Sequence, residues 1–164
     1  MALFNKIMFP LDLSDVSIKI VPYVVEMVGK YNAELHVVHA TNINRLYVSP
    51  GMSATYIDEI EPGIEAEAEK NTSAFINSYF KNTTVIQKIL AGRPGPEIIR
   101  YAEEVGVDLI IMGHSSTGIA RAVFGSVAGY VVKYSHAPVL IISPGILENK
   151  LQARKQSKKK ESLF

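Results

Sequence analysis

The sequence of 164 residues contains no cysteine, and its charged side chains make up only 20% of the total. Without cysteine the chain has no disulfide, no thiolate nucleophile and no cysteine-ligated metal site. No apolar run approaches the roughly 18–20 residues needed to cross a bilayer, so we expect no integral membrane association. The first residues show no charged leader followed by an apolar segment and a cleavage site, so we expect no signal peptide. A cytoplasmic location is the expectation that follows.

The net charge of +1 is unevenly distributed along the chain. Residues 150–164 hold six basic side chains and one acidic one, whereas residues 1–149 hold eleven basic and fifteen acidic ones. A mildly acidic body does not produce the electrostatic field of a nucleic-acid-binding domain, so we expect no nucleic-acid partner. We therefore predict a single domain over residues 1–146 and a basic, flexible tail over residues 147–164. The alternative for the tail is a weak electrostatic arm for anionic lipid or nucleic acid.

Short apolar runs alternate with segments of helical periodicity, and nearly half of the residues (48%) are hydrophobic. The patterns predict strands over 6–11, 34–40, 83–90, 108–112 and 138–142, and helices over 15–30, 64–79, 96–104 and 126–135. Pro62-Gly63 is interpreted as a turn before the second helix. Strands that alternate with helices indicate an α/β fold, with a doubly wound, Rossmann-like parallel sheet covered by helices on both faces.

Ligands of such sheets bind beyond the carboxyl ends of the strands, so the residues that follow each strand are the candidates. They are Pro10 to Asp12, His39 to Thr41, Ala91 to Pro94, and Gly113 to Gly118. Gly113 follows a buried strand, where a tight turn or a close approach of the backbone is needed. Gly125-Ser126 begins a predicted helix, where free N–H groups, the helix dipole and a hydroxyl would face an anion. The alternative is an ordinary Gly/Ser loop with a helix N-cap.

Several motifs in this order give the chain a resemblance to the universal stress protein family. They include Pro10-Leu11-Asp12-Leu13-Ser14, the strand end Val38-His39-Ala40, the strand Asp108 to Gly113, and Gly125-Ser126-Val127-Ala128. The resemblance extends from Ile7 to Ile142. It implies the sheet order 3-2-1-4-5 and a homodimer.

The nucleotide-binding branch of that family carries the pattern G-x2-G-x9-G-[ST], from which this chain departs. With nine residues between it and Gly125, the chain has Ser115 rather than glycine, and one residue instead of two separates Ser115 from Gly113. A shorter turn displaces the backbone donors, and the Cβ of Ser115 crowds the phosphate position. The hydroxyls of Ser115, Ser116 and Thr117 offer additional donors in compensation.

The resemblance implies a role for most of the other positions. Asp12 matches the acid that accepts hydrogen bonds from the ribose hydroxyls, Pro10 and Ala40 match positions beside the adenine, and Gly113, Gly125 and Ser126 match phosphate-binding positions. The predicted cofactor-binding residues are Pro10, Asp12, Ala40, Met112, Gly113, Ser115, Ser116, Gly125 and Ser126.

The resemblance predicts a stress-response regulator that binds ATP or AMP, with Mg²⁺ as a possible companion of ATP. We expect no catalytic residue and no dedicated metal site, because no general base and no second acid for Mg²⁺ are evident. His36 and His39 are three apart in one strand, so they point to opposite faces and cannot share a metal ion. The alternatives are a nucleotide-free dimeric scaffold with a degenerate phosphate loop, and a slow ATPase. Protein partners are not evident from the sequence.

The last strand, Pro138 to Ile142, is short and almost wholly apolar. An apolar strand at the edge of a sheet, with no charge or bulge to discourage pairing, is a surface that proteins normally cover. The resemblance implies that a second copy covers it, through pairing of strand five with strand five about a two-fold axis. The alternative is that the basic tail folds back over the edge.

Overall fold

The computed structural model describes residues 3–42, 54–114 and 125–143, in which strands and helices alternate as predicted. The elements are β1 (Lys6–Pro10), α1 (Asp15–Tyr31), β2 (Glu34–Thr41), α3 (Ala54–Tyr79), β3 (Val85–Ala91), α4 (Pro94–Val105), β4 (Leu109–Gly113), α5 (Ser126–Tyr134) and β5 (Val139–Ile142).

The strands form one parallel sheet in the order β3-β2-β1-β4-β5, which confirms the predicted topology. β1 lies in the centre, with Ile7 in register with Leu35 of β2 and Leu109 of β4. The carboxylate of Asp108 accepts hydrogen bonds from the backbone N–H groups of Asn5 (2.8 Å) and Lys6 (2.9 Å). These bonds tie the start of β1 to the start of β4, so the two strands end at the same edge of the sheet.

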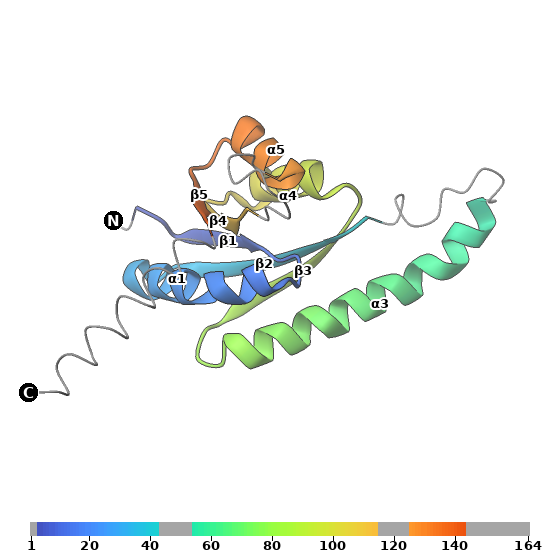
Figure 1. Cartoon of the computed structure of the whole chain (residues 1–164), viewed down its shortest axis with the longest axis horizontal. Coiled ribbons are helices and arrows are strands. Elements are labelled where there is room, and N and C mark those ends of the chain that lie inside the picture. Colours follow the sequence, from blue (N-terminus) through green and yellow to red (C-terminus); the bar gives the residue numbers. More distant parts are fainter. Residues whose placement is uncertain (1–2, 43–53, 115–124, 144–164) are drawn as a thin grey trace, which may run out of the picture.

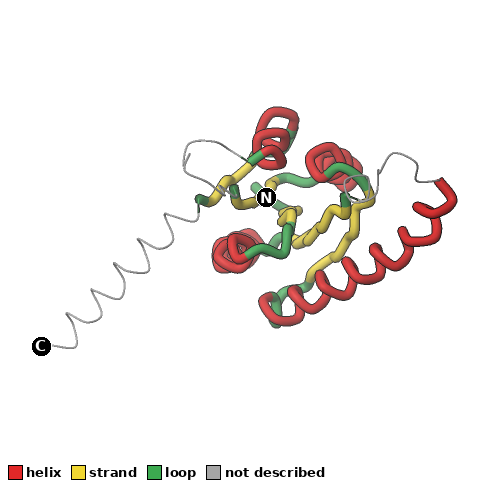
Figure 2. The backbone as a smooth tube through the Cα atoms, turned by 45° about the vertical axis from the view of Figure 1, so that its right-hand side comes forward, coloured by secondary structure: helices red, strands yellow, loops and turns green. Residues whose placement is uncertain are grey.

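Two helices cover each face of the sheet, and Figures 1 and 2 show the resulting three layers. α1 and α3 pack on one face, where Ile7 and Phe9 of β1 meet Ile20 and Val24 of α1. α4 and α5 pack on the other face around a second cluster, which includes Met8 of β1. Successive side chains of a strand point to opposite faces, so a strand covered on both sides must be apolar throughout, as β1 and β4 are.

α3 begins ten residues earlier than predicted, at Ala54, and Pro62-Gly63 lies inside it rather than in a turn. The apolar spacing explains the difference, because Ile60 and Ile64 continue the four-residue interval that leads to the buried Ala68. Pro62 and Gly63 are exposed, so water can reach the carbonyl that proline leaves without a donor. In Figures 1 and 2 the amino-terminal part of α3 extends beyond the sheet.

The predicted basic tail, residues 147–164, lies outside the described residues, as do Ser115, Ser116 and the shortened turn that contains Ser115. β4 extends one residue further than predicted, so that Gly113 is its last residue rather than the first residue after it. None of the helices in the described part of the chain is long and apolar enough to cross a membrane.

Candidate functional site

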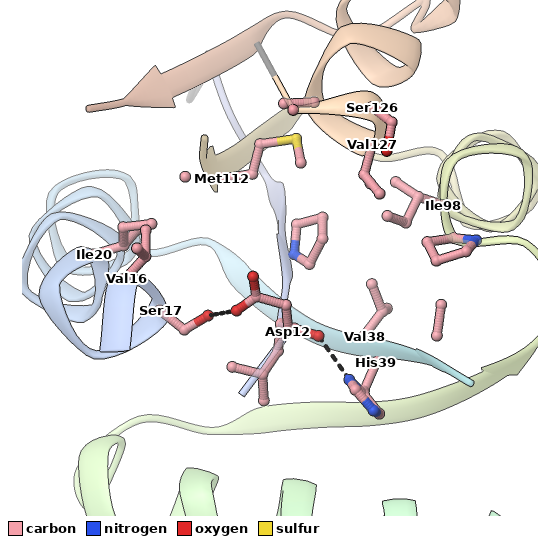
Figure 3. Close-up of a pocket in the computed structure, with 17 residues that line it drawn as sticks. Asp12, Val16, Ser17, Ile20, Val38, His39, Ile98, Met112, Ser126 and Val127 are labelled. Atoms are coloured by element: carbon pink, nitrogen blue, oxygen red, sulfur yellow. Dashed lines mark hydrogen bonds between the residues drawn. The ribbon is translucent and has the colours of Figure 1, made fainter. Parts of the chain in front are cut away.

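A cavity of about 300 Å³ opens at the carboxyl ends of β1, β2 and β4 and is bounded by α1, α4 and α5. Figure 3 shows Asp12, Ser17 and His39 on one side of it, and Met112, Ser126 and Val127 on the other. Its size falls at the lower end of the range typical of small-molecule sites. The described residues that line it are Pro10, Leu11, Asp12, Val16, Ser17, Ile20, Val38, His39, Ala40, Pro94, Ile98, Met112, Gly113, Gly125, Ser126, Val127 and Ala128.

Seven of the nine predicted cofactor-binding residues line this cavity. They come from four separate parts of the chain: the ends of β1, β2 and β4, which parallel pairing brings to one edge of the sheet, and the amino end of α5. They are Pro10, Asp12, Ala40, Met112, Gly113, Gly125 and Ser126. The other two, Ser115 and Ser116, lie outside the described residues.

The carboxylate of Asp12 is held in place by three hydrogen bonds to one of its oxygens. Oδ1 accepts from the backbone N–H of Ser14 (3.0 Å), from the hydroxyl of Ser14 (2.5 Å) and from the hydroxyl of Ser17 (2.6 Å). Burial raises the pKa of Asp12, but the hydrogen bonds from Ser14 and Ser17 outweigh it and hold the pKa below the ordinary 3.8. The group is therefore an ionised acceptor at neutral pH, and its second oxygen is available to a ligand hydroxyl.

Ser14 lies at the N-cap of α1, but its hydroxyl bonds to Asp12 rather than to the helix. Ser17, in the first turn of α1, is 3% exposed. Ser17 is not among the site residues predicted from the sequence. A sequence feature that could have pointed to it is the spacing of Ser17 three positions after Ser14, because the first turn of a helix brings such side chains together.

The ring of His39 fastens the end of β1 to β2. Its Nδ1 lies 2.7 Å from the carbonyl oxygen of Leu11, which can only accept, so Nδ1 carries the proton. The backbone N–H of Leu11 in turn donates to the carbonyl of Val38 (2.7 Å). These two bonds fix the backbone just before Asp12, and the dashed line from His39 in Figure 3 marks the first of them.

His36 lies on the face of β2 that α4 covers, opposite to the face of His39. Its Nε2 lies 2.8 Å from Glu34 Oε1, and its Nδ1 lies 2.9 Å from the hydroxyl of Tyr101 on α4. A carboxylate only accepts, so Nε2 carries a proton. Within the described ranges, no group of three or more His, Asp or Glu side chains is placed to hold a metal ion.

Gly113 closes the cavity floor by letting α1 approach the end of β4. A Cβ at this position would lie 2.4 Å from Ile20 Cδ1 and 2.7 Å from Val16 Cγ1. Both side chains also line the cavity, so the absence of a side chain at Gly113 determines the cavity's shape on this side. The close approach predicted for Gly113 is therefore made by helix α1.

The amino end of α5 forms the wall opposite Asp12. Gly125 is the N-cap, and its carbonyl accepts from Gly129 N–H (2.8 Å). The first-turn N–H groups of Ser126 and Val127 have no carbonyl one turn earlier in the helix to bond to. An ionised carboxylate thus faces, across an apolar cavity, a helix end whose first N–H groups make no backbone hydrogen bond in the described ranges, an arrangement that suits a ligand with hydroxyls at one end and an anionic group at the other.

Comparison with known proteins gives a match to the model of the Universal stress protein family over residues 3–143. Among curated proteins, the chain is 31% identical over 150 residues to Universal stress protein YxiE of Bacillus subtilis, a match that covers 85% of this chain and 99% of YxiE. It is 30% identical over 142 residues to Universal stress protein MJ0531 of Methanocaldococcus jannaschii, which covers 85% of this chain and 82% of MJ0531.

Solved structures show the same fold. The structure of the protein MJ0577 superposes with a TM-score of 0.72 at 26% identity, covering 86% of this chain and 96% of that one. A universal stress protein of Archaeoglobus fulgidus in complex with dAMP superposes with a TM-score of 0.60 at 22% identity, over 85% of this chain and 98% of that one. A universal stress protein in complex with cAMP gives a TM-score of 0.57 at 23% identity, over 87% of this chain and 98% of that one.

Proposed function

Because the chain belongs to the universal stress protein family, we propose that it is a regulatory protein that binds an adenine nucleotide. The observation that carries the proposal is the cavity itself. The ionised carboxylate of Asp12 faces the amino end of α5 across a space lined by Pro10, Ala40 and Ile98. Two proteins of the same fold are described in complex with dAMP and with cAMP, which makes an adenine nucleotide the ligand class to test first.

In the proposed complex each end of the nucleotide meets complementary chemistry. The free oxygen of Asp12 accepts from the ribose hydroxyls, because Oδ1 is already engaged by Ser14 and Ser17. The adenine lies against the apolar residues Pro10 and Ala40. The first phosphate meets the free N–H groups and the hydroxyl at Gly125-Ser126, where the helix dipole favours negative charge.

The direct test is isothermal titration of the full chain with adenosine, AMP, ADP and ATP, each with and without Mg²⁺. Binding is also expected to raise the melting temperature, because a ligand at about 100 times its Kd stabilises the native state by about 2.7 kcal/mol. Absence of heat and of any thermal shift with all four ligands at millimolar concentration would contradict the proposal and favour the nucleotide-free scaffold.

Two variants locate the site. Asp12→Asn removes the charge that accepts from the ribose and is expected to weaken the binding of all adenine ligands, adenosine included. Gly125→Val places a branched side chain at the mouth of α5 and is expected to abolish nucleotide binding. Gly63→Val, in the exposed part of α3 with open space around it, is the matched control and should bind normally. Equal binding by Gly125→Val and Gly63→Val would exclude the end of α5 as the phosphate position.

We propose that the protein hydrolyses ATP slowly or not at all. A phosphate-release assay with ATP and Mg²⁺ separates this proposal from the slow ATPase. If phosphate release continues at a steady rate and Asp12→Asn abolishes it, the protein is an ATPase instead. Mass spectrometry of natively extracted protein would identify which nucleotide co-purifies. A cytoplasmic location belongs to this proposal and is testable by fractionation.

We propose, in addition, that the chain forms a homodimer through β5. This strand lies at one edge of the sheet, and Leu140 at its centre is 38% exposed. The backbone groups on the side of β5 away from β4 lie at the sheet edge, where a second copy would pair with them across a two-fold axis.

The opposite edge strand offers a matched control for the dimer. Ile86 of β3 is exposed to the same extent as Leu140, at 38%. Sedimentation equilibrium should show that Leu140→Lys is monomeric and that Ile86→Lys remains dimeric. A chain that ends at Gly145 should remain dimeric if the tail takes no part. A monomeric wild-type protein, or a dimer lost only in Ile86→Lys, would contradict pairing through β5.

A further inference from the structure

The cavity holds a negative charge but lacks a positive one among the described residues that line it. Asp12 is the only one of these side chains with a formal charge, and it is ionised at neutral pH. His39 donates from Nδ1 to the Leu11 carbonyl, and no Lys or Arg side chain is among the described residues that line this cavity. A nucleoside di- or triphosphate carries several negative charges, and their burial next to a carboxylate is unfavourable without a cation.

A second cavity, of about 240 Å³, adjoins the first and has a positively charged residue, Arg93, in its lining. It is lined by Asn42, which follows β2, by residues 93–96 at the start of α4, and by Ser126, Val127 and Tyr130 of α5. Pro94, Ser126 and Val127 line both cavities, so the two spaces meet where the proposed phosphate position lies. Arg93 is the charged residue among those that line the second cavity.

The backbone on this side offers few donors, so side chains must supply them. Arg93 is the N-cap of α4, and Pro94 and Pro96 occupy two of the first three helical positions. Proline has no N–H group, which leaves Gly95 as the one backbone donor among those three positions. On the α4 side of the second cavity, the side chains of Arg93 and Asn42 are therefore the main donors that an anion could meet.

The acid that would normally neutralise Arg93 is engaged elsewhere. Glu97 lies four positions after Arg93, the spacing at which helical ion pairs form. Its Oε2 instead accepts from Nε (3.0 Å) and Nη2 (2.8 Å) of Arg100. Arg93 is an exposed residue that lines the second cavity, and in the part of the chain that the structure describes it forms no ion pair.

We propose that the second cavity takes the distal phosphates of a nucleotide held in the first, and that Arg93 binds them. The inference rests on the proposed nucleotide binding and specifies its ligand class, nucleoside di- and triphosphates in preference to monophosphates. The planar guanidinium suits this role because it forms two parallel hydrogen bonds to phosphate oxygens. Arg93 is then a specificity-determining residue, since AMP does not extend into the second cavity.

The test compares AMP, ADP and ATP by isothermal titration of the full chain carrying Arg93→Gln. This change removes the charge and leaves the start of α4 intact, because the Arg93 side chain makes no capping hydrogen bond. Loss of one charge-assisted contact is expected to weaken the binding of ADP and of ATP by about tenfold or more. AMP should bind nearly as it does to the wild type, and Arg93→Lys should retain part of the preference.

Lys81→Gln is the control, since it removes one positive charge from an exposed position. Lys81 follows α3 and lines neither cavity. It should leave the ratio of ATP to AMP affinity unchanged. Increasing salt should reduce the ATP preference of the wild type more than that of Arg93→Gln.

The outcomes separate this inference from the proposed function. A wild type that binds no adenine nucleotide overturns the proposed function, and the phosphate preference with it. A wild type that binds, combined with an Arg93→Gln variant that binds ATP equally well or loses AMP and ATP to the same extent, overturns the inference alone. A change of the same size in Lys81→Gln would also overturn it, because the effect would then follow from net charge alone.

Discussion

Replacement of Gly113 by alanine tests whether the approach of α1 to β4 shapes both the core and the cavity. The new Cβ would lie 2.4 Å from Ile20 Cδ1 and 2.7 Å from Val16 Cγ1, whereas ordinary contacts begin near 3.4 Å. The methyl of Ile20 must therefore move by about 1 Å. Val16 is β-branched and in a helix has essentially one rotamer, so it cannot rotate away without shifting the backbone of α1.

The expected cost is that of moderate overpacking, about 1–3 kcal/mol. Alanine restricts the unfolded chain more than glycine does, and this effect stabilises the folded state by about 0.5–1 kcal/mol. We therefore expect Gly113→Ala to lower the free energy of unfolding by about 1–2 kcal/mol, with a fall in Tm of about 2–4 °C for each kcal/mol. Urea denaturation followed by circular dichroism measures the change. Nucleotide affinity should fall as well, because Val16 and Ile20 are displaced towards the cavity that they line.

Gly29→Ala is the control for the glycine effect alone. Gly29 lies in α1 with no atom within 4 Å of the position of its Cβ, so this variant should be more stable than the wild type by about 0.5–1 kcal/mol. The double variant Gly113→Ala with Val16→Ala should be more stable than the sum of the single effects predicts, because it removes one of the two contacts. Full stability of Gly113→Ala, or strict additivity in the double variant, would refute the reasoning.

Three further predictions concern polar groups of the described chain. The hydroxyl of Thr72 on α3 is fully buried without a hydrogen-bond partner among the described residues. Thr72→Val should therefore raise the free energy of unfolding by about 1 kcal/mol, measured as a higher urea midpoint. A lower midpoint would contradict this prediction. Tyr101→Phe leaves the buried Nδ1 of His36 without its hydrogen-bond partner and should lower the free energy of unfolding by about 1–3 kcal/mol. Tyr79→Phe removes a hydroxyl at an exposed position and should have a smaller effect. The folded-state pKa of Asp12 lies below 3.8, so its hydrogen bonds stabilise the protein fully above that value and are lost as the pH falls through the folded-state pKa. The stability difference between wild type and Asp12→Asn should therefore be constant near neutral pH and vanish in acid, and a constant difference down to the lowest pH would refute the ionised bond.

The sequence by itself determined the order of the elements and the edge of the sheet at which a site forms. Alternation of apolar strands with amphipathic helices is a local pattern, visible within a few residues, and it requires a parallel sheet covered on both faces. Because parallel strands all end at one edge, the residues just after β1, β2 and β4 had to meet there. Asp12, Ala40 and Gly113 were identified in this way, and the strand order itself came from the family resemblance rather than from periodicity.

Tertiary structure alone decided which of those residues act on one another. Ser17 is the partner of Asp12, and Val16 and Ile20 are the reason for glycine at position 113, although nothing local to Gly113 indicates a helix that lies more than ninety residues earlier in the chain. The helix through Pro62-Gly63 persists because its apolar spacing continues on both sides of them, a constraint imposed by the sheet beneath its carboxyl half. Contacts of this kind depend on the distance between elements in the folded chain, which no short window of sequence contains.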